Sequence, residues 1–509
     1  MTLSSSSPYV PAAPESSTPS HTAGTGTVPA QNLLPLVVDL DGTLTATDTL
    51  VESLIQVVKQ DPVNLLRLPS WLLQGRAAFK RKVATYARIN AAHLPYRQAL
   101  LDYLVEEKAR GRRIVLATAA HRSIAQGVAD HLPVFDQLLC TEDNENLKGE
   151  AKLKAIEQQV APDFVYAGDS SADLPIWRAA KAAVLVGVSP QVAREARQST
   201  TIEREFFNEK PGIKVWAKAL RVHQWIKNLL LFVPLLTAFS FSELGNVVEC
   251  IMAFIAFSIA ASATYIVNDL WDLESDRQHA RKRLRPFACA RIPIATGVLA
   301  AAALLAGAFV IAAFLPKAFM LLLAIYVVMT TTYSMVLKSY VLIDVLMLSL
   351  LYTLRILAGA AAIGIVVSSW LLAFSMFVFL SLALVKRCSE LVSLAASGKD
   401  ATRGRDYRVG DLAVLWPMGV SATISSLVVF GLFINSDETQ MRYLSPMILW
   451  LTTLLLSYWL GRLWIKTARG EMHDDPVVYA VVNRGSRMTV IAIVFSMLLA
   501  RFLPLDRFL

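Results

Sequence analysis

Two aspartates that lie two positions apart, Asp39 and Asp41, directly follow the short apolar run that ends at Val38. Gly42 comes next and allows a tight turn, so that both carboxylates can point into one site. Such a pair suits phosphoryl transfer with Mg²⁺, in which one carboxylate attacks phosphorus and becomes phosphorylated while the other protonates the leaving group. The simpler alternative is an acidic turn after a strand.

Further polar side chains follow the next apolar runs in this part of the chain. The runs at 33–38, 113–118 and 164–169 have the length and composition of buried parallel strands. Proteins with such sheets place their chemistry just beyond the strand ends. The side chains concerned are Thr118, Lys148, Asp169 and Asp173.

The order of these elements over about residues 33–200 resembles the haloacid dehalogenase (HAD) phosphatase superfamily. The resemblance implies an α/β, Rossmann-like domain with a small helical cap at about 46–110. It implies Asp39 as nucleophile, Asp41 as acid/base, Thr118 and Lys148 as phosphate ligands, Asp169 and Asp173 closing the site, and Asp39, Asp41 and Asp169 as Mg²⁺ ligands. Lys152, one helical turn beyond Lys148, is the alternative for the lysine role.

The cap contains the stretch LLRLPSWLLQGRAAFKRK at 65–82, which mixes apolar and basic residues. A stretch of this kind can lie on a membrane surface. We favour an ordinary cap helix with a basic outer face.

A second acidic group follows a long apolar run. Its members are Asn268, Asp269, Asp272 and Asp276, and helical spacing sets their side chains on one face. Carboxylates gathered at a membrane edge repel one another unless a cation neutralises them, as Mg²⁺ does when it bridges a diphosphate. The simpler alternative is a solvated acidic loop.

Composition separates the chain into two physically different parts. Of the 509 residues, 55% are hydrophobic and 17% are charged, and beyond about residue 215 uncharged runs of bilayer-spanning length recur. They predict nine transmembrane segments, at roughly 223–241, 247–268, 292–314, 317–335, 341–362, 368–385, 412–433, 444–464 and 487–506. If the first domain is cytosolic, the loops richest in Lys and Arg are cytosolic too, as the positive-inside rule requires.

The remaining bulk properties exclude several classes of protein. Much of the excess in the net charge of +9 lies in short loops between apolar runs, without an aromatic-basic groove, so we expect no nucleic-acid partner. The four cysteines are scattered and signal neither a disulfide framework nor a zinc site. Residues 1–32 have the composition of a disordered tail, without a secretory signal.

The acidic motif and the nine spans, over roughly residues 215–509, resemble the UbiA superfamily of intramembrane prenyltransferases. The resemblance implies an all-α polytopic membrane domain that activates a diphosphate with divalent metal at Asp269, Asp272 and Asp276. Where aromatic prenyltransferases of this type carry a second DxxxD motif, this chain has YSMVLKSYVLIDV with the single aspartate Asp344. This departure favours a donor other than a prenyl diphosphate.

Other segments resemble a phosphoribosyltransferase branch of this family, namely VHQWIKN at 222–228, YSMVLK at 333–338, LRILAG at 354–359 and KRCSEL at 386–391. Members of the branch transfer 5-phosphoribose from phosphoribosyl diphosphate to decaprenyl phosphate. The resemblance implies substrate contacts for Lys227, Asn268, Lys282, Arg283, Arg285, Tyr333, Lys338, Arg355, Lys386 and Arg387. For most of these cations the competing role is topology or headgroup contact.

Arg355 differs from the other cations because it interrupts an apolar span and needs an anionic partner or a wet cavity. Two nearby acidic features have simpler interpretations. Glu390 is expected to pair with Lys386, one turn away. The MHDDP segment, with His473, Asp474 and Asp475, is expected to be a solvated loop.

Together these features predict a bifunctional membrane enzyme that transfers 5-phosphoribose to a polyprenyl (decaprenyl) phosphate and then dephosphorylates the lipid-linked product. The predicted organisation is a tail (1–32), a HAD-like domain (33–200), a linker or interfacial segment (201–220) and a UbiA-like domain (221–509). Both sites would bind Mg²⁺ and face the cytosol, in a multi-pass protein of a bacterial inner (plasma) membrane. A homo-oligomer is compatible with the sequence.

Three alternatives remain open at this point. One is an aromatic or quinone prenyltransferase that uses a prenyl diphosphate. In another, the HAD domain is a tethered regulatory module or an unrelated phosphatase. The third is a lipid or ion transporter.

Overall fold

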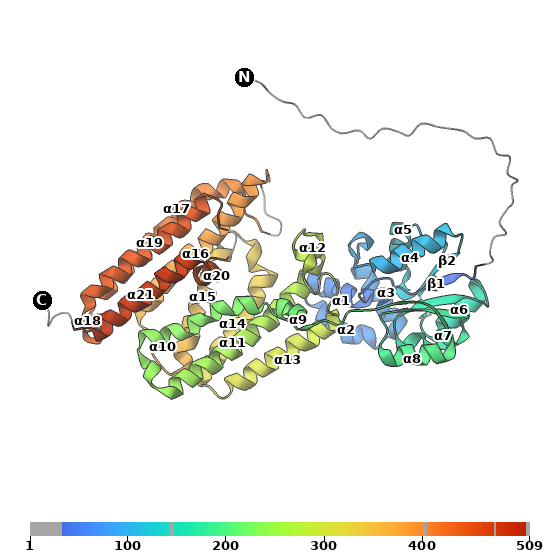
Figure 1. The fold of residues 1–509 in the computed structure, drawn as a ribbon, viewed down its shortest axis with the longest axis horizontal. Coiled ribbons are helices and arrows are strands. Elements are labelled where there is room, and N and C mark those ends of the chain that lie inside the picture. The colour runs from blue at the N-terminus through green and yellow to red at the C-terminus, as the bar shows by residue number, and fades with distance from the viewer. Residues whose placement is uncertain (1–32, 142–146, 399, 401–404, 473–474, 505–509) are drawn as a thin grey trace, which may run out of the picture.

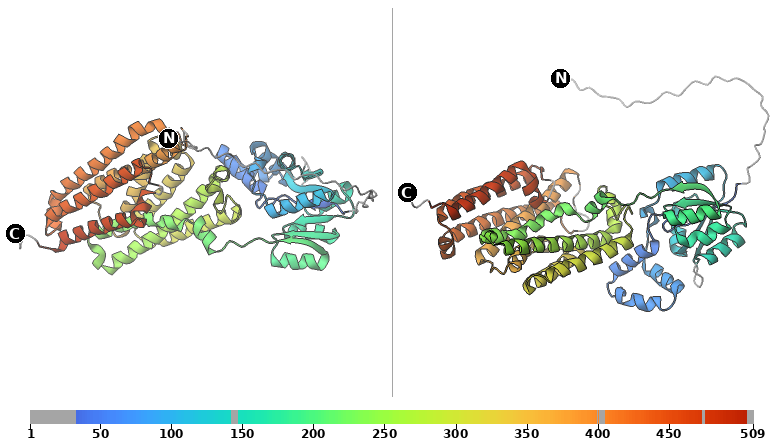
Figure 2. Two further views of the ribbon diagram at one scale, coloured as in Figure 1. Left: turned by 45° about the horizontal axis from the view of Figure 1, so that its top comes forward. Right: turned by 60° about the horizontal axis from the view of Figure 1, so that its bottom comes forward.

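The computed structural model describes residues 33–504 except 142–146, 399, 401–404 and 473–474. An α/β domain lies at one end of a bundle of long helices, and a small group of helices lies between the two (Figure 1). Figure 2 shows the same arrangement from two further directions. Each predicted half therefore forms its own folded unit.

A parallel sheet forms the centre of the α/β domain. Within the described residues it has six strands in the order β3-β2-β1-β4-β5-β6. The strands are β1 (Leu36–Val38), β2 (Ile114–His121), β3 (Gln137–Thr141), β4 (Val165–Gly168), β5 (Ala182–Val186) and β6 (Thr201–Phe206). All three residues of β1 are fully buried, because apolar clusters cover both faces of the sheet.

Helices on both faces cover the sheet, and three more make the cap. The cap helices are α1 (Thr49–Gln60), α2 (Asn64–Leu72) and α3 (Arg76–Tyr86). The others are α4 (Gln98–Ala109), α5 (Arg122–His131), α6 (Glu150–Gln159), α7 (Leu174–Ala179) and α8 (Pro190–Ser199). The cap has its own small core, in which Val57, Trp71 and Val83 are buried.

The outer face of α2 differs from the prediction. We expected a basic outer face, but Leu66 and Leu73 are 80% and 89% exposed, and Leu65 and Leu72 are exposed as well. Of the apolar residues of α2, Trp71 and Leu68 pack into the cap core. A row of exposed leucines on a short helix forms an apolar patch, and such patches typically contact another molecule or a membrane.

Strand β6 corrects the predicted linker at 201–220. The strand pairs with β5, so the sheet continues through Phe206. Helix α9 (Ile213–Ala219) occupies the end of the same segment.

Eight helices in the part of the chain that the structure describes are long and apolar enough to cross a membrane. They contain α11 (Leu244–Trp271), α13 (Ile294–Ala312), α14 (Lys317–Met335), α15 (Ile343–Ala362), α16 (Ser369–Ala396), α17 (Leu412–Ile434), α19 (Leu449–Ala468) and α21 (Arg484–Phe502). The shorter helix α10 (Val233–Thr237) precedes them, and α12 (Leu273–Gln278), α18 (Asp437–Arg442) and α20 (Pro476–Val482) lie between them.

The first of the nine predicted spans, 223–241, is not a single α-helix. It begins as a 3₁₀ helix, Val222–Phe232, and continues as α10, with Pro234 at its start. The backbone of the 3₁₀ segment packs directly on the backbone of α15 at Gly359. The contact is so close that a Cβ added to Gly359 would lie 2.0 Å from the carbonyl oxygen of Leu231. A glycine in the neighbouring helix thus permits this close approach.

The cap is docked on the membrane domain through α1. Val51 and Ile55 pack into an apolar cluster with Ile266, Leu270 and Leu273 at the junction of α11 and α12. One turn from them, Glu52 of α1 forms a two-pronged ion pair with Arg277 of α12. Helix α1 therefore belongs to the cores of both the cap and the domain interface.

Candidate active sites

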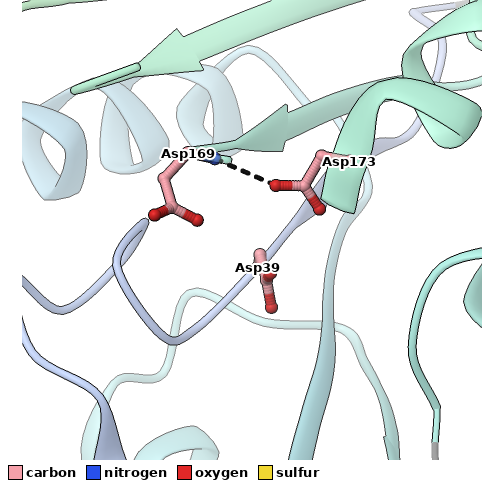
Figure 3. A group of neighbouring side chains, drawn as sticks. All are labelled: Asp39, Asp169 and Asp173. Carbon is pink, nitrogen blue, oxygen red and sulfur yellow. Dashed lines mark hydrogen bonds between the residues drawn. The ribbon is translucent and has the colours of Figure 1, made fainter. Parts of the chain in front are cut away.

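Three carboxylates meet at the carboxyl end of the sheet. Asp39 follows β1, whereas Asp169 and Asp173 follow β4, and the sheet pairs β1 with β4 directly. One oxygen from each carboxylate lies within 4.8 Å of the others (Figure 3). Carboxylate oxygens gathered in this way are the donors that Mg²⁺ prefers.

Hydrogen bonds hold the trio in place. The Oδ2 atom of Asp173 accepts bonds from the backbone N–H groups of Asp169 and Ser170, each 3.1 Å long. Its Oδ1 atom accepts from the Tyr166 hydroxyl at 3.0 Å. Lys152 Nζ lies 2.9 Å from Asp39 Oδ2 and 3.0 Å from the Tyr166 oxygen. Asp39 is thereby fixed beside a cation.

The structure separates the two candidate lysines. Lys148 is exposed and lines the cavity above the carboxylates, whereas Lys152 is buried and contacts Asp39. The alternative lysine, and not Lys148, therefore has the contact expected of the lysine role. Thr118 is fully buried, and its Oγ1 accepts from the Ala120 N–H at 3.0 Å. Cavity contact instead comes from the next residues, 119–121.

Asp41 lies on the cap side of the trio. Its Oδ1 atom accepts a 2.8 Å hydrogen bond from the backbone N–H of Thr49, the first residue of α1. Burial raises the pKa of Asp41 to about 7, and the negative charge of Asp48 adds to the rise. A carboxyl group that holds its proton near neutral pH suits the acid/base role.

Two acids of the trio, Asp39 and Asp169, are also difficult to ionise. Burial, followed by the charges of Asp173 and Asp39, raises the pKa of Asp169 to about 7. Burial likewise raises the pKa of Asp39, although the Lys152 ammonium opposes this. A Cβ on Gly42, whose φ is +77°, would lie 2.2 Å from Asp169 Oδ2, so the turn closes tightly on the carboxylates. Crowded, buried acids of this kind fit a divalent cation.

The cap and a neighbouring loop complete a cavity of about 740 Å³ above the trio. Lys80 of α3 reaches into it and donates to the Ala119 carbonyl at 2.7 Å. Arg97 donates from Nη2 to the Gly42 carbonyl at 2.9 Å. The sequence analysis did not single out either cation, although both suit a phosphate substrate.

In the membrane domain, each carboxylate of the acidic motif pairs with a cation. Asp269 contacts Arg221 and Arg285, the latter at 3.2 Å, while Arg285 lies 2.6 Å from Asp276. Lys338 Nζ lies 2.7 Å from Asp272 Oδ2. Lys338 and Arg285 were expected from the sequence, whereas Arg221 was not.

The three carboxylates do not converge as Asp39, Asp169 and Asp173 do; within the described residues their oxygens form no group within mutual metal-ligating distance. One observation still fits a cation. Asp276 Oδ1 is buried and, among the described residues, has no hydrogen-bond partner. A carboxylate oxygen left bare beside Asp269 and Asp272 is a donor that Mg²⁺ can use. Asn268 lies half-buried one residue before Asp269.

A second group of cations meets around Asp475, at the start of α20. Lys227 Nζ lies 2.7 Å and Lys386 Nζ 3.3 Å from Asp475 Oδ2, and the Tyr352 hydroxyl donates to Oδ1 at 3.2 Å. The expectation of a solvated loop is therefore wrong for Asp475, which is 9% exposed at its side chain. His473 and Asp474 lie outside the described residues.

Arg355 is buried on α15 with neutral partners. It donates to Asn228 Oδ1 at 2.9 Å and to the Tyr326 hydroxyl at 3.2 Å. Its guanidinium also lies 4.9 Å from the centre of the Tyr326 ring and 5.6 Å from that of Tyr352. Aromatic faces and amide oxygens thus surround Arg355, where the sequence led us to expect an anionic partner or a wet cavity.

The other four predicted substrate-contact residues form two groups, one in a buried ion-pair network and one on an exposed turn. Arg387 is almost fully buried and pairs with Asp344 and Glu390, so Glu390 does not pair with Lys386 as predicted. Tyr333 donates to Asp344 at 2.7 Å and completes this network. These contacts suit a positioning role. Lys282 and Arg283 are exposed on the short 3₁₀ turn after α12.

Comparison with known proteins agrees with both halves. The model of the UbiA prenyltransferase family matches residues 230–486, and that of the haloacid dehalogenase-like hydrolases matches residues 36–178. The uncharacterized protein y4nM of Sinorhizobium fredii is 39% identical over 89% of this chain and 88% of its own length. The nodulation protein NoeC of Azorhizobium caulinodans is 32% identical over 55% of this chain and 92% of its own.

A third relative matches only the membrane half. It is the decaprenyl-phosphate phosphoribosyltransferase of Corynebacterium glutamicum, 30% identical over 44% of this chain and 69% of its own length. Among solved structures, a UbiA homolog from Archaeoglobus fulgidus bound to GPP and Mg²⁺ aligns with a TM-score of 0.43 and 17% identity, over 56% of this chain and 99% of that one. The chain is therefore a multi-pass membrane protein of the UbiA prenyltransferase family that carries a haloacid dehalogenase-like hydrolase domain ahead of its membrane domain.

Proposed function

We propose that this protein transfers 5-phosphoribose from phosphoribosyl diphosphate to a polyprenyl phosphate, and then removes the 5-phosphate from the lipid-linked product. The first step uses the membrane domain and the second uses the HAD-like domain. Both sites face the cytosol, at a bacterial plasma membrane.

One observation carries the link between the two reactions. Asp276 of the acidic motif is followed directly by Arg277, which binds Glu52 of the cap. The same cap helix begins at Thr49, whose N–H bonds to Asp41 in the phosphatase site. A product released near the acidic motif thus lies beside the domain that would act on it next.

In the transfer step, a phosphate oxygen of the lipid attacks the anomeric carbon of ribose, and the bond to the diphosphate breaks. Arg221, Arg285 and Lys338 stand at the carboxylates where the diphosphate would bind, and can take up its charge as it leaves. Lys227 and Lys386 form a second cationic group that suits the lipid phosphate or the ribose 5-phosphate.

In the hydrolytic step, an oxygen of Asp39 attacks the 5-phosphate while Asp41 gives its proton to the departing ribose oxygen. Water then attacks the phosphoaspartate, and Asp41 takes a proton back. Lys152 holds Asp39 in position. Mg²⁺ bound at the two acidic groups would offset the charge of the phosphoryl group in one site and of the leaving diphosphate in the other.

Labelled phosphoribosyl diphosphate tests both steps. The protein in detergent receives this donor, labelled in the ribose carbons, with decaprenyl phosphate and Mg²⁺. We expect labelled lipid from the wild type, none from Asp269→Asn, and a trapped 5-phosphorylated lipid from Asp39→Asn. If the wild type leaves the lipid unlabelled but consumes a prenyl diphosphate, the protein is a prenyltransferase and the proposal fails.

A further inference from the structure

We propose that the phosphatase cavity is completed by the membrane domain and selects phosphomonoesters that are carried on a membrane lipid over soluble ones. This inference rests on the proposed function of the HAD-like domain and names the class of substrate that its site takes.

The lining of the cavity comes from three parts of the chain. Its acidic end holds Asp39 and Asp169, from the sheet. The cap contributes apolar side chains, among them Leu72 and Phe79. Residues 293–295, where the membrane-spanning helix α13 begins, also line the cavity. The catalytic acids therefore open onto a space bordered by the end of a transmembrane helix.

Buried contacts hold this arrangement in place. Arg277 Nη1 and Nη2 lie 2.8 and 2.6 Å from the two oxygens of Glu52, and its Nε donates to the Ala288 carbonyl at 3.0 Å. Both side chains of the pair are 9% exposed. A two-pronged pair buried to this degree is geometrically exacting, and loss of one partner leaves an uncompensated charge.

Further contacts along α1 reinforce the ion pair. Lys59 Nζ donates to the Trp271 carbonyl at 3.2 Å, beside the apolar contacts of Val51 and Ile55. At its other end α1 is bonded through the Thr49 N–H to Asp41. The position of the cap on the membrane domain therefore also sets the position of the cap over the catalytic acids.

The exposed leucines of α2 give the cap a second tie to the bilayer. Leu66 and Leu73 are the most exposed of them and lie seven residues apart, on one side of the helix. The cap that bears them lies next to the end of α13 (Figure 2). Because α13 has the length and composition of a membrane span, its end would lie near the surface of the bilayer. A lipid surface is the one occupant that suits leucines at this level, with the nearby Arg67 suited to anionic headgroups.

The test compares a lipid-borne and a soluble substrate on the full-length protein in lipid–detergent micelles with Mg²⁺. The lipid-borne probes are decaprenyl-phosphoryl-5-phosphoribose and phosphatidic acid, and the soluble probe is ribose 5-phosphate. We expect kcat/KM to be at least about tenfold higher for a lipid-borne probe than for ribose 5-phosphate. Equal or better turnover of ribose 5-phosphate would overturn the inference. Hydrolysis of phosphatidic acid but not of the ribosyl lipid would support this inference while contradicting the proposed function.

Charge reversal tests the role of the docking contact. Glu52→Arg and Arg277→Glu should each lower kcat/KM for the lipid-borne probe about tenfold more than they lower kcat/KM for ribose 5-phosphate. The double variant, which restores an ion pair of opposite polarity, should regain most of the loss. Equal losses for both substrates in the single variants contradict the inference.

A second variant serves if the reversed pair does not fold. Leu66→Glu combined with Leu73→Glu adds two charges on the exposed face of α2, and should lower lipid-borne turnover alone. Gln74→Glu is the matched control, because Gln74 is exposed beside Leu73. This substitution adds a charge to the same surface without removing a leucine. If the leucine variant and this control behave alike, the bilayer contact does not exist.

Discussion

Lys148 and Lys152 lie four residues apart at the start of α6, yet they have different surroundings. Lys152 is 3% exposed at its side chain and bonded to Asp39, whereas Lys148 is exposed at the rim of the cavity. We expect Lys152→Ala to lower phosphate release by about a hundredfold or more, because Asp39 loses its charge-assisted contact. Lys148→Ala is the matched control, with an expected loss of less than about tenfold. The opposite order would return the role to Lys148.

Asp475 is the shared partner of Lys227 and Lys386. Burial by itself would raise the pKa of Asp475, but the charges of Lys386 and Lys227 hold that pKa below its ordinary value. Asp475→Asn leaves two ammonium groups close together without their anion, so we expect ribose transfer to fall by about a hundredfold. Phosphate release from a supplied lipid-linked 5-phosphate should stay at the wild-type rate.

Asp406→Asn provides the comparison for this variant, since Asp406 is an exposed aspartate between α16 and α17. Transfer in that variant should match the wild type. Wild-type transfer in Asp475→Asn would make Asp475 a structural residue only.

Motif spacing found the acids at both sites but not all of their partners. Asp39, Asp41, Asp169 and Asp269 follow recognisable patterns within a few residues of sequence. Arg221 could not be found in this way, because its pairing with Asp269 joins residues 48 positions apart. Asp475 was predicted to be solvated because its sequence neighbours in MHDDP are polar. The cations that it contacts, Lys227 and Lys386, are distant in the sequence and come close to it only in the folded structure.

Among the elements, the 3₁₀ helix Val222–Phe232 depends on one glycine of α15. A Cβ on Gly359 would approach the Leu231 carbonyl oxygen to 2.0 Å, so Gly359→Ala must push the 3₁₀ helix away from α15. We expect a lower unfolding temperature and a loss of ribose transfer of about tenfold or more, since Lys227 and Asn228 lie on the displaced segment. Thermal unfolding in detergent and the labelled-ribose assay measure the two effects.

Gly461→Ala is the internal control for this element. Gly461 lies on the membrane-spanning helix α19, and an added Cβ would meet no atom within 4 Å. Its unfolding temperature should equal or slightly exceed that of the wild type, because alanine favours helices. If both substitutions have the same effect on the unfolding temperature and on ribose transfer, the protein accommodates the added Cβ beside Leu231 without a measurable cost.

The same element shows where sequence patterns lose information. Hydropathy identified 223–241 as apolar, but an apolar run has the same appearance as an α-helix, a 3₁₀ helix or a break between them. The residue that permits this segment to approach α15 as a 3₁₀ helix is Gly359, which is more than a hundred positions away in the sequence. Three of the six described strands, β1, β2 and β4, were predicted, because each is a short apolar run followed by a polar turn. Strands β3, β5 and β6 were not predicted, and β6 lies in the segment that was expected to be a linker.

At the scale of the whole molecule, the two sites share one rigid connection through α1. If the lipid-linked intermediate passes between sites of one molecule, a mixture of Asp39→Asn and Asp269→Asn proteins should work poorly. The first variant can transfer but not hydrolyse, and the second can hydrolyse but not transfer. We expect the mixture to accumulate the 5-phosphorylated lipid, whereas the wild type at the same total concentration does not.

Time courses of labelled lipid, separated by phosphorylation state, measure this accumulation. Lowering the amount of protein per micelle should enlarge it further. A mixture that matches the wild type in final product at every dilution would mean that the intermediate diffuses freely between molecules.

The docking of the two halves was not predictable from sequence. Glu52 and Arg277 are 225 positions apart, and each resembles an ordinary surface charge on a short helix. Their burial follows from the assembled structure, in which Val51 and Ile55 place α1 on the junction of α11 and α12. Family resemblance described each half separately and carried no information on this contact.

Helix α1 has consequences for how such a fusion can arise and change. Its twelve residues supply a hydrogen bond to Asp41, part of the cap core and the contact with the membrane domain. A mutation in α1 that improves one of these three contacts therefore also affects the other two. If a phosphatase domain from an unrelated protein were joined to this membrane domain, it would be covalently attached but would not dock in this position, unless it had a matching α1. The two halves are thus expected to have been inherited together, with α1 and α12 changing as a pair.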